Sequence, residues 1–390
     1  MSKTLQDYAT LINDTIQSNE INHYITTDNM CQNLGGIDTF KNINIPQGKV
    51  RSFQKDDVLL SNIRLYFRKV YRAKQKGGCS SDVLVFRAKH IDSATLFAIL
   101  SSQIFTDYAC SGSQGSKMPR GNKTHMMDFK IPTINFTIAK IFNSIQNKIE
   151  NNHKINELLH KILELLYEQY FVRFDFLDEN NKPYQTSGGK MKFSKELNRL
   201  IPNDFEVKTL GELITWISGS QPPKSCHIYE HKEGYIRFIQ NRDYSSNDYI
   251  TYIPISKNNK ICYQYDIMID KYGEAGAVRF GLQGAYNVAL SKISVINQSM
   301  QEYIRSYLNS KPIKKYLSNA CMASTRSSLN ENHIYSLMLP IPPINLLQKY
   351  EKIAKNIITA IINNNQSTQT LTALRDFLLP LLLTQQVKPQ

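Results

Sequence analysis

A long, uninterrupted pattern of apolar positions runs through residues 134–171. Steps of four and three residues reach ten positions, eight of them apolar, with no Gly or Pro in the run. The positions are Ile134, Ile138, Ile141, Ile145, Lys148, Asn152, Ile155, Leu159, Ile162 and Leu166. This spacing predicts a coiled-coil helix rather than the broader apolar stripe of a helix lying on a domain. At 1.5 Å per residue the helix would be roughly 55 Å long.

The same spacing returns near the end of the chain. Its ten positions are Leu346, Tyr350, Ile353, Ile357, Ala360, Asn364, Ser367, Leu371, Leu374 and Leu378. Both series have an asparagine at the sixth position, Asn152 in the first and Asn364, 212 residues later, in the second. An asparagine buried between paired helices costs stability but fixes their register and number. The shared spacing favours two helices that pack on each other, against the alternative that each packs on its own domain.

Short motifs upstream of the two apolar series also recur, in the same order and 209–211 residues apart. They are Asp57–Leu60 and Asp266–Ile269, Ala109–Cys110 and Ala320–Cys321, and Ile131–Ile134 and Ile341–Ile344. The chain is therefore typical of two copies of one plan: a globular part, an Ile-Pro stop and a long helix. We place the first globular part at residues 1–133 and the first long helix at 134–175. A connector follows at 176–205, then the second globular part at 206–345, the second long helix at 346–384 and a tail at 385–390.

Within both globular parts, short apolar runs alternate with turn signals. Strands are expected at Val58–Leu60, Val83–Phe86, Tyr235–Ile239 and Tyr249–Ile255, and helices from Ser93 to about Tyr108 and near Gln301–Lys315. The alternating, Gly-rich stretch 265–293 predicts a twisted antiparallel sheet with bulges. The predicted fold class is α+β, with two domains of twisted sheet plus helices, each followed by a long helix.

Composition narrows the class of protein. The chain has 390 residues, 41% of them apolar, so it is too long for one core and too apolar for disorder. Its six cysteines include no Cys-x-x-Cys pair, which argues against a structural zinc site or a redox motif. The first 20 residues are polar, and no apolar run approaches the roughly 18 residues of a membrane helix. We therefore expect a cytoplasmic protein with reduced thiols.

The formal net charge of +14 indicates a polyanionic partner, and part of the excess is concentrated in one region. Residues 51–90 hold ten Lys or Arg and three Asp. Here Arg64, Arg68 and Lys69 are interleaved with aromatic residues, a pattern that suits phosphate contact and stacking. For any single residue, a solvated edge strand protected by charge is an equally good interpretation.

Two loops and one polar tetrapeptide carry the remaining candidates for DNA contact. The Gly-rich loop 111–132 is no P-loop, because Gly121 and Lys123 are not adjacent. The loop 318–333 occupies the corresponding place in the second half, and Gln240–Asp243 lies between two predicted strands. We predict base contacts at Arg120, Asn122, Gln240, Asn241 and Arg326, and phosphate contacts at Arg64, Arg68, Lys69, Lys117 and Lys123.

One catalytic pattern is interpreted as accidental. His227–His231 reads His-x-x-Glu-His, an inverted zinc-protease motif that needs both histidines on one helix face. Pro222–Pro223 and Gly234 leave room for barely two helical turns, so ordinary surface or loop histidines are favoured over a metal site. The sequence has no S-adenosylmethionine-type glycine motif and no Gly-x-Ser-x-Gly elbow. We therefore expect no metal site and no catalysis by this chain alone.

Four motifs together resemble the DNA-specificity subunit of type I restriction–modification enzymes. They are Gly115–Gly121, Leu166–Phe176, the connector Asp178–Lys190 and Leu374–Leu382. The resemblance covers essentially the whole chain and has the order of that family: target recognition domain, helix, target recognition domain, helix. The Lys117–Gly121 motif has no clear equal in the second half, where Ser327–Glu331 stand.

The resemblance implies a fold and a set of partners. The two long helices would pair as an antiparallel coiled coil with pseudo-twofold symmetry, and act as a ruler between two DNA half-sites. The implied seam residues are Ile138, Ile145, Asn152, Leu159, Leu166, Tyr350, Ile357, Asn364, Leu371 and Leu378. The partners would be double-stranded DNA, two methyltransferase (modification) subunits and restriction/translocase subunits. S-adenosylmethionine, ATP and Mg would belong to those subunits, with no cofactor bound by this chain.

Two other classes of protein remain open at this point. One is a stand-alone enzyme that modifies nucleic acid, which methylation or cleavage by the purified chain would support. The other is a coiled-coil scaffold without DNA binding, which failure to bind any duplex at any salt concentration would favour.

Overall fold

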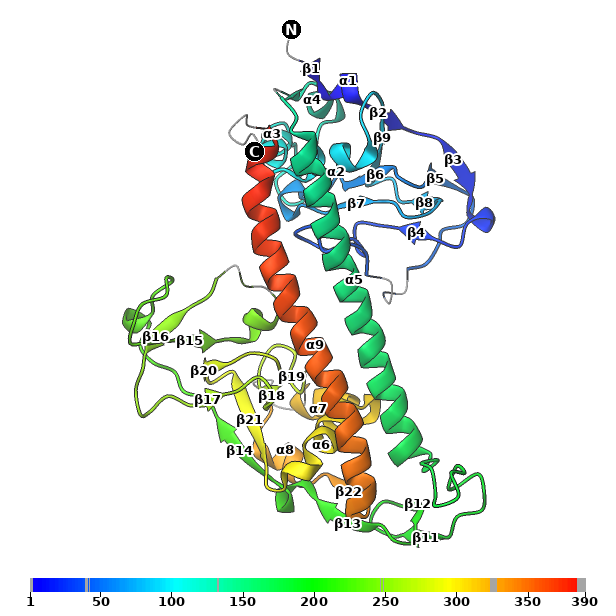
Figure 1. Ribbon diagram of the computed structural model, residues 1–390, viewed down its shortest axis with the longest axis vertical. Coiled ribbons are helices and arrows are strands. Elements are labelled where there is room, and N and C mark those ends of the chain that lie inside the picture. The colour runs from blue at the N-terminus through cyan, green and yellow to red at the C-terminus, as the bar shows by residue number, and fades with distance from the viewer. Residues whose placement is uncertain are drawn as a thin grey trace. The chain divides into compact units, whose positions relative to one another are not determined.

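The computed structural model describes residues 3–38, 41, 43–131, 133–245, 247, 249–322 and 328–383. The chain divides into two compact units (Figure 1): unit 1 comprises Met1–Lys154 and Gln366–Gln390, and unit 2 comprises Ile155–Asn365. Helices α5 (Phe136–Tyr167) and α9 (Ile344–Leu378) each contribute one segment to each unit. This division differs from the one expected from sequence, in which the long helices were separate parts.

Unit 1 is built on two four-stranded sheets. Their strands are β2 (Ala9–Ile12), β9 (Val83–Ala88), β6 (Val58–Ser61) and β7 (Val70–Arg72), in that order, and β3 (Thr15–Gln17), β5 (Lys49–Phe53), β8 (Gly77–Cys79) and β4 (Tyr24–Ile25). Strand β6 is buried on both faces: Val58 and Leu60 pack in one core cluster and Leu59 in another. Because side chains alternate across a strand, a continuous apolar run indicates that both faces are covered.

Smaller elements complete unit 1. They are β1 (Lys3–Thr4), which pairs with β10 (Lys130–Ile131), and helices α1 (Leu5–Tyr8), α2 (Ser93–Ser101), α3 (Gln103–Ser111) and α4 (Lys123–Met127). The single helix expected from Ser93 to about Tyr108 is two helices that divide at Ser102. The Ser102 hydroxyl accepts a hydrogen bond from the Phe105 N–H, so this serine ends α2 and caps α3.

Unit 2 repeats this plan. Its sheets are β14 (Ile214–Ser218), β21 (Leu290–Val295), β18 (Ile267–Asp270) and β19 (Val278–Arg279), in that order, and β16 (Tyr252–Pro254), β15 (Tyr235–Ile239), β20 (Gly284–Tyr286) and β17 (Ile261–Cys262). The other elements are the hairpin β11 (Met191–Ser194)–β12 (Arg199–Pro202), the pair β13 (Glu206–Thr209)–β22 (Met338–Ile341), and helices α6 (Gln301–Asn309), α7 (Lys311–Met322) and α8 (Glu331–Tyr335). The predicted helix Gln301–Lys315 is therefore also divided, at Ser310.

The two units share one strand topology. In unit 1, β8 pairs antiparallel with β5 and parallel with β4; in unit 2, β20 pairs antiparallel with β17 and parallel with β15. Helices α2 and α6 begin 208 residues apart, at Ser93 and Gln301, and α5 and α9 also begin 208 residues apart, at Phe136 and Ile344. The predicted duplication is confirmed, and the predicted α+β class with it.

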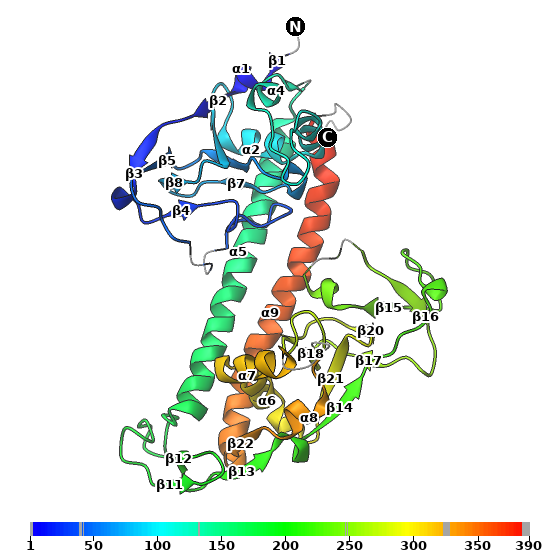
Figure 2. The ribbon, with the colours of Figure 1, turned by 180° about the vertical axis from the view of Figure 1, so that it is seen from behind.

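The long helices pair antiparallel within each unit, as predicted, and both views show the paired segments side by side (Figures 1 and 2). In unit 1 the Arg375 guanidinium donates to Gln146 Oε1 (3.2 Å), and Asn152 Nδ2 donates to Thr368 Oγ1 (3.2 Å). In unit 2 Asn364 Nδ2 donates to Asn156 Oδ1 (2.9 Å). From Gln146 to Asn152 the residue numbers rise along α5, while those of their partners fall along α9, from Arg375 to Thr368. The two helices are therefore antiparallel.

The heptad positions on the helices need one correction. The implied seam residues are buried or half-buried, but the alternate positions Ile141, Ile155 and Ile162 are 44, 43 and 49% exposed. Buried residues lie one position after Ile141, Lys148 and Ile155, at Phe142, Ile149 and Asn156, and α9 shows the same displacement, with Ala354, Ile361 and Arg375 buried. Apolar residues occupy both candidate flanks of these helices, so spacing alone did not identify the flank that packs.

A buried acidic cluster lies where α6 meets α9 in unit 2. The Glu302 N–H donates to both carboxylate oxygens of Glu351 (2.8 and 3.0 Å), while the Glu302 side chain pairs with Arg305 (2.7 Å), both of them buried. Burial, followed by the charge of Glu302, raises the pKa of Glu351 to about 7. The carboxyl of Glu351 is therefore protonated in the folded chain at pH values where it ionises in the unfolded chain.

We expect Glu351→Gln to stabilise the protein above neutral pH. Because the folded pKa is raised, Glu351 favours folding at low pH, and that contribution is lost as pH rises from about 4.5 to 7. The variant should have a free energy of unfolding about 1–2 kcal/mol higher than the parent chain at pH 8, a value reduced because the side chain is half-buried, and a similar one at pH 4. Urea titrations at both pH values, with the exposed Glu206→Gln as control, would measure the difference. An equal difference at pH 4 and 8 would contradict the assignment.

Candidate nucleic-acid interface

The predicted basic loop of unit 1 lies on the turn between β6 and β7. The Arg64 N–H donates to the Pro119 carbonyl oxygen (2.9 Å), and the Gly121 N–H donates to the Asn62 carbonyl oxygen (3.1 Å). A β-bridge joins Ile63 to Arg120. Two segments that sequence reasoning treated separately are thus one surface, which we call the unit 1 basic surface: residues 62–68 and 114–123.

Close packing explains why residue 121 is a glycine. A Cβ atom there would lie 2.1 Å from Met126 Cε, 2.8 Å from Leu65 Cδ1 and 2.9 Å from Asn62 Oδ1. A side chain there would therefore require Met126, Leu65 and Asn62 to move. The turn itself is constrained, because Arg64 and Arg68 both have φ of 49°, a left-handed conformation that is costly for residues other than glycine.

The unit 1 basic surface presents three exposed cations. Lys117 lies at the tip of the loop and Lys123 is the first residue of α4. Arg120 donates to Asp82 Oδ1 (3.1 Å) but keeps 59% of its side chain exposed. Arg64 donates to the Lys117 carbonyl oxygen and lies 5.9 Å from the centroid of the Phe67 ring. Exposed cations on a constrained loop suit contact with phosphates and base edges.

Two of the predicted phosphate contacts point elsewhere. The Arg68 guanidinium donates to the Ser101 carbonyl oxygen (2.9 Å), and the Lys69 ammonium donates to the Thr27 carbonyl oxygen. Burial lowers the pKa of both side chains. Both cations therefore connect the turn to neighbouring segments of unit 1.

Asn122 has a structural bond in addition to its predicted role. Its side-chain oxygen accepts from the His125 N–H (3.1 Å) and so caps α4. The ring of His125 stacks on Tyr108, with 4.1 Å between ring centroids. Asn330 caps α8 in unit 2 with the same bond to the His333 N–H (3.3 Å), so the cap belongs to the shared frame of the two units.

The predicted base contacts of unit 2 are held by internal bonds. Asn241 Nδ2 donates to the Tyr272 carbonyl oxygen (3.2 Å), and Gln240 Nε2 donates to Thr251 Oγ1 (3.5 Å). The Gln240 N–H donates to the buried Asp243 carboxylate (2.8 Å), whose pKa is raised by burial. Arg326 lies outside the described residues.

Sequence reasoning assigned no role to the turn between β18 and β19. This turn, Lys271–Ala277, is the unit 2 counterpart of the turn between β6 and β7. The Asp57–Leu60 motif recurs at an offset of 209 residues, and the same offset applied two residues beyond the motif aligns Asn62 with Lys271. The sequence therefore contains a signal for this turn, although the Asp57–Leu60 motif by itself indicates only duplication.

The histidine pattern at 227–231 does not form a helix. A 3-10 turn spans Lys224–Cys226, and Ile228 makes an isolated bridge to Tyr252. Neither histidine is therefore placed on a helix face as the protease motif requires. Over the part of the chain that the structure describes, no group of three or more His, Cys, Asp or Glu side chains is placed to hold a metal ion.

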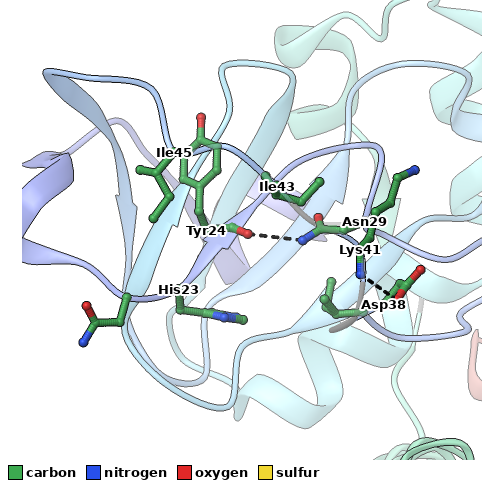
Figure 3. A pocket seen from close by; sticks show the side chains of 9 residues that line it. His23, Tyr24, Asn29, Asp38, Lys41, Ile43 and Ile45 are labelled. Atoms are coloured by element: carbon green, nitrogen blue, oxygen red, sulfur yellow. Dashed lines mark hydrogen bonds between the residues drawn. The ribbon is translucent and has the colours of Figure 1, made fainter. Parts of the chain in front are cut away.

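A pocket of about 160 Å³ lies in unit 1 beside β4 (Figure 3). It is lined by Asn22, His23, Tyr24, Asn29, Ile37, Asp38, Lys41, Ile43 and Ile45. Asn29 Nδ2 donates to the Tyr24 carbonyl oxygen (3.2 Å), and the Lys41 N–H donates to Asp38 Oδ1 (3.2 Å). None of the predicted DNA contacts lines this pocket, so we place the candidate interface on the basic turns instead.

The long helices also expose apolar side chains away from their seam. In unit 1 these are Phe136, Ile141, Leu374 and Phe377, and in unit 2 they are Ile155, Leu158, Ile162, Leu165, Ile344 and Ile353. We call these the helix flanks. Phe136 and Ile344 are the first residues of α5 and α9 and are equivalent in the duplication. Contiguous exposed apolar residues are typical of surfaces that bind another protein.

Comparison with known proteins agrees with this architecture. Residues 202–373 match the family model described as the type I restriction modification DNA specificity domain. The chain is 25% identical over 300 residues to the type I restriction enzyme MjaIX specificity subunit of Methanocaldococcus jannaschii, which covers 74% of this chain and 67% of that protein. It is 22% identical over 195 residues to the MjaVIII specificity subunit of the same organism, which covers 50% of this chain and 45% of that protein.

The fold has also been observed in a crystal structure. The S subunit of the type I restriction–modification system from M. genitalium superposes with a TM-score of 0.63, at 14% sequence identity, over 99% of this chain and 96% of that chain. In the described part of the chain, no helix is both long and apolar enough to cross a membrane. The duplicated topology, the antiparallel helices and the matched domain lead to one conclusion: this chain is similar to the DNA-specificity subunits of type I restriction–modification systems.

Proposed function

We propose that the chain reads a bipartite DNA sequence, with unit 1 contacting one half and unit 2 the other. The observation that carries this proposal is the duplication: two units of one topology each place a turn between equivalent strands, and a loop packs on each turn. A protein with two related readers suits a target with two unlike halves, because the frame is shared while the exposed side chains differ.

The exposed residues of the unit 1 basic surface divide by chemistry. Lys117 and Lys123 carry point charges that suit phosphates and set the orientation of the protein on the duplex. Arg120 carries a planar fork of donors, which suits the O6 and N7 acceptors of guanine in the major groove. Its exposed pair with Asp82 is weak enough to be exchanged for a base.

The helix flanks provide the surface for partner subunits. Their two sets of apolar residues lie on equivalent helix segments, which suits two copies of one methyltransferase subunit. Restriction/translocase subunits would join the larger assembly. We assign S-adenosylmethionine, ATP and Mg²⁺ to those partners and no cofactor to this chain.

Methylation sequencing of a host carrying this chain and its partner subunits tests the proposal. The expected result is one methylated motif with two defined halves and an undefined gap of fixed length. Methylation by the purified chain alone would favour a stand-alone enzyme. Failure of the assembled complex to bind any duplex, at low as well as high salt, would favour a scaffold without DNA binding.

We expect Lys117→Ala and Lys123→Ala to weaken binding of all duplexes alike. Each lost phosphate contact should reduce the slope of log K against log salt concentration by about 0.9. Fluorescence anisotropy of a labelled duplex from 50 to about 200 mM salt would measure this slope. Lys140→Ala, an exposed lysine on α5, is the matched control and should leave the slope unchanged. A loss confined to one DNA sequence would contradict the phosphate assignment.

A further inference from the structure

The turn Lys271–Ala277 of unit 2 occupies the same position as the turn between β6 and β7, which is part of the unit 1 basic surface. The Lys271 N–H donates to the Ala289 carbonyl oxygen (2.8 Å), and the Lys271 carbonyl accepts from the Leu329 N–H (3.0 Å). Asn62 makes the same two bonds, to Asp82 (2.8 Å) and from Gly121 (3.1 Å). Lys271 and Asn62 are therefore equivalent positions of the two units, identified by backbone bonds and not by side-chain similarity.

The side chains at this position differ between the units. Asn62 is buried in unit 1, and a half-buried cation follows two residues later as Arg64, 5.9 Å from the centroid of the Phe67 ring. In unit 2, Lys271 itself is the cation, and its ammonium lies 5.9 Å from the ring centroid of Tyr272. The Tyr272 side chain is 45% exposed. Each turn thus combines a cation with an adjacent aromatic ring, by a different choice of residues.

Internal bonds hold the unit 2 turn in one conformation. The Asn241 amide donates to the Tyr272 carbonyl oxygen (3.2 Å), and the Gly276 N–H donates to the Asp270 carbonyl oxygen (2.9 Å). Arg279 pairs with both Asp270 (3.0 Å) and Glu274 (2.6 Å), which offsets the acidic charge at the base of the turn. A constrained turn with an exposed tyrosine and a half-buried lysine is preorganised for a ligand, because little conformational entropy is left to lose.

We infer that the Lys271–Tyr272 turn is the DNA-reading element of unit 2, with Lys271 contacting a phosphate and Tyr272 a base edge in one half of the target. This inference rests on the proposed function. Asn241 acts as a positioning residue: its amide fixes the carbonyl of Tyr272 and does not reach the DNA. Asn241 was predicted to contact a base directly; here it instead positions Tyr272, which contacts the base.

A cycle of protein and DNA changes tests the inference. The assembled complex would be titrated with its methylated motif, with the first half-site scrambled, and with the second half-site scrambled. Tyr272→Ala should weaken binding of the intact motif by roughly 5- to 100-fold, the range of one base contact. The loss of affinity caused by Tyr272→Ala should disappear when the half-site contacted by unit 2 is scrambled. It should persist when the half-site contacted by unit 1 is scrambled. Arg120→Ala in unit 1 should show the opposite dependence on the two halves.

Controls separate recognition from folding and from charge. Tyr272→Phe keeps the ring and removes the hydroxyl, so it reports the hydroxyl contact without disturbing the turn. Lys232 lies 5.9 Å from the Tyr235 ring, the same arrangement elsewhere in unit 2, and Lys232→Ala should leave specificity unchanged. Asn241→Ala should reproduce part of the Tyr272→Ala loss with the same half-site dependence.

The outcomes distinguish this inference from the proposed function. If the parent complex binds its motif but Tyr272→Ala is without effect, the inference is wrong and the function stands. If scrambling the same half-site abolishes the effects of both Tyr272→Ala and Arg120→Ala, then Tyr272 does not contact a half-site of its own and its assignment as the unit 2 reader is wrong. If the parent complex binds no specific duplex, the proposed function itself fails.

Discussion

Four residues inserted at facing points of the two long helices are expected to widen the gap between the recognised DNA half-sites by one or two base pairs. The facing points lie between Lys154 and Ile155 on α5 and between Asn365 and Gln366 on α9, next to the bond from Asn364 to Asn156. Four helical residues add about 6 Å, and one base pair adds about 3.4 Å along the duplex. Methylation sequencing of the variant would give the new gap directly.

The antiparallel register explains why the insertion should be made in both helices. Asn152, Asn156 and Asn364 make hydrogen bonds between α5 and α9, and an insertion in one helix alone would separate these partners. A matched insertion of four residues changes the local winding of a coiled coil but keeps both helices continuous. Four residues added to the turn 195–198, between β11 and β12, provide the control and should leave the gap unchanged. An unchanged gap in the matched helix variant would show that these helices do not set the spacing.

The fold was predictable where side-chain spacing determines local structure. The two long helices follow from the spacing of apolar residues, and the buried run Val58–Leu60 forms β6 with both faces covered. The error at Ile141, Ile155 and Ile162 has a physical cause. From Ile138 and Leu159, a step of three and a step of four both reach apolar residues, so spacing alone does not decide which of the two is buried. After Asn152 the apolar Ile155 is exposed and the polar Asn156 is buried, because Asn156 bonds to α9.

The candidate site was predictable as a region but not residue by residue. Composition identified the loop 111–132 and the segment around Arg64 as basic and exposed, and the structure brings them together through Gly121 and Asn62. The direction of each side chain depends on tertiary contacts that no local pattern records. Arg68 and Arg120 look alike in sequence, yet the first donates to the Ser101 carbonyl and the second remains largely exposed.

Loss of the Arg375 side chain should destabilise unit 1 more than loss of any exposed arginine. Arg375 is 2% exposed and donates to Gln146 Oε1 on α5 (3.2 Å) and to Asp376 (3.0 Å). Gln146 in turn donates to the Leu34 carbonyl oxygen (2.6 Å), so the guanidinium joins both helices to a loop of the first domain. Arg375→Met would leave the buried Gln146 Oε1 without its donor, and we expect it to lower the free energy of unfolding by roughly 2–4 kcal/mol.

Arg173→Met is the matched control, because Arg173 is largely exposed and lies 3.8 Å from Glu168. Its expected cost in a urea titration is below about 0.5 kcal/mol. The double variant Gln146→Met with Arg375→Met removes an acceptor together with its donor, so it should cost less than the sum of the two single changes, by about 1 kcal/mol. Strict additivity would show that the guanidinium and the amide act independently. The buried polar bond between α5 and α9 would then not be the interaction that holds their register in unit 1.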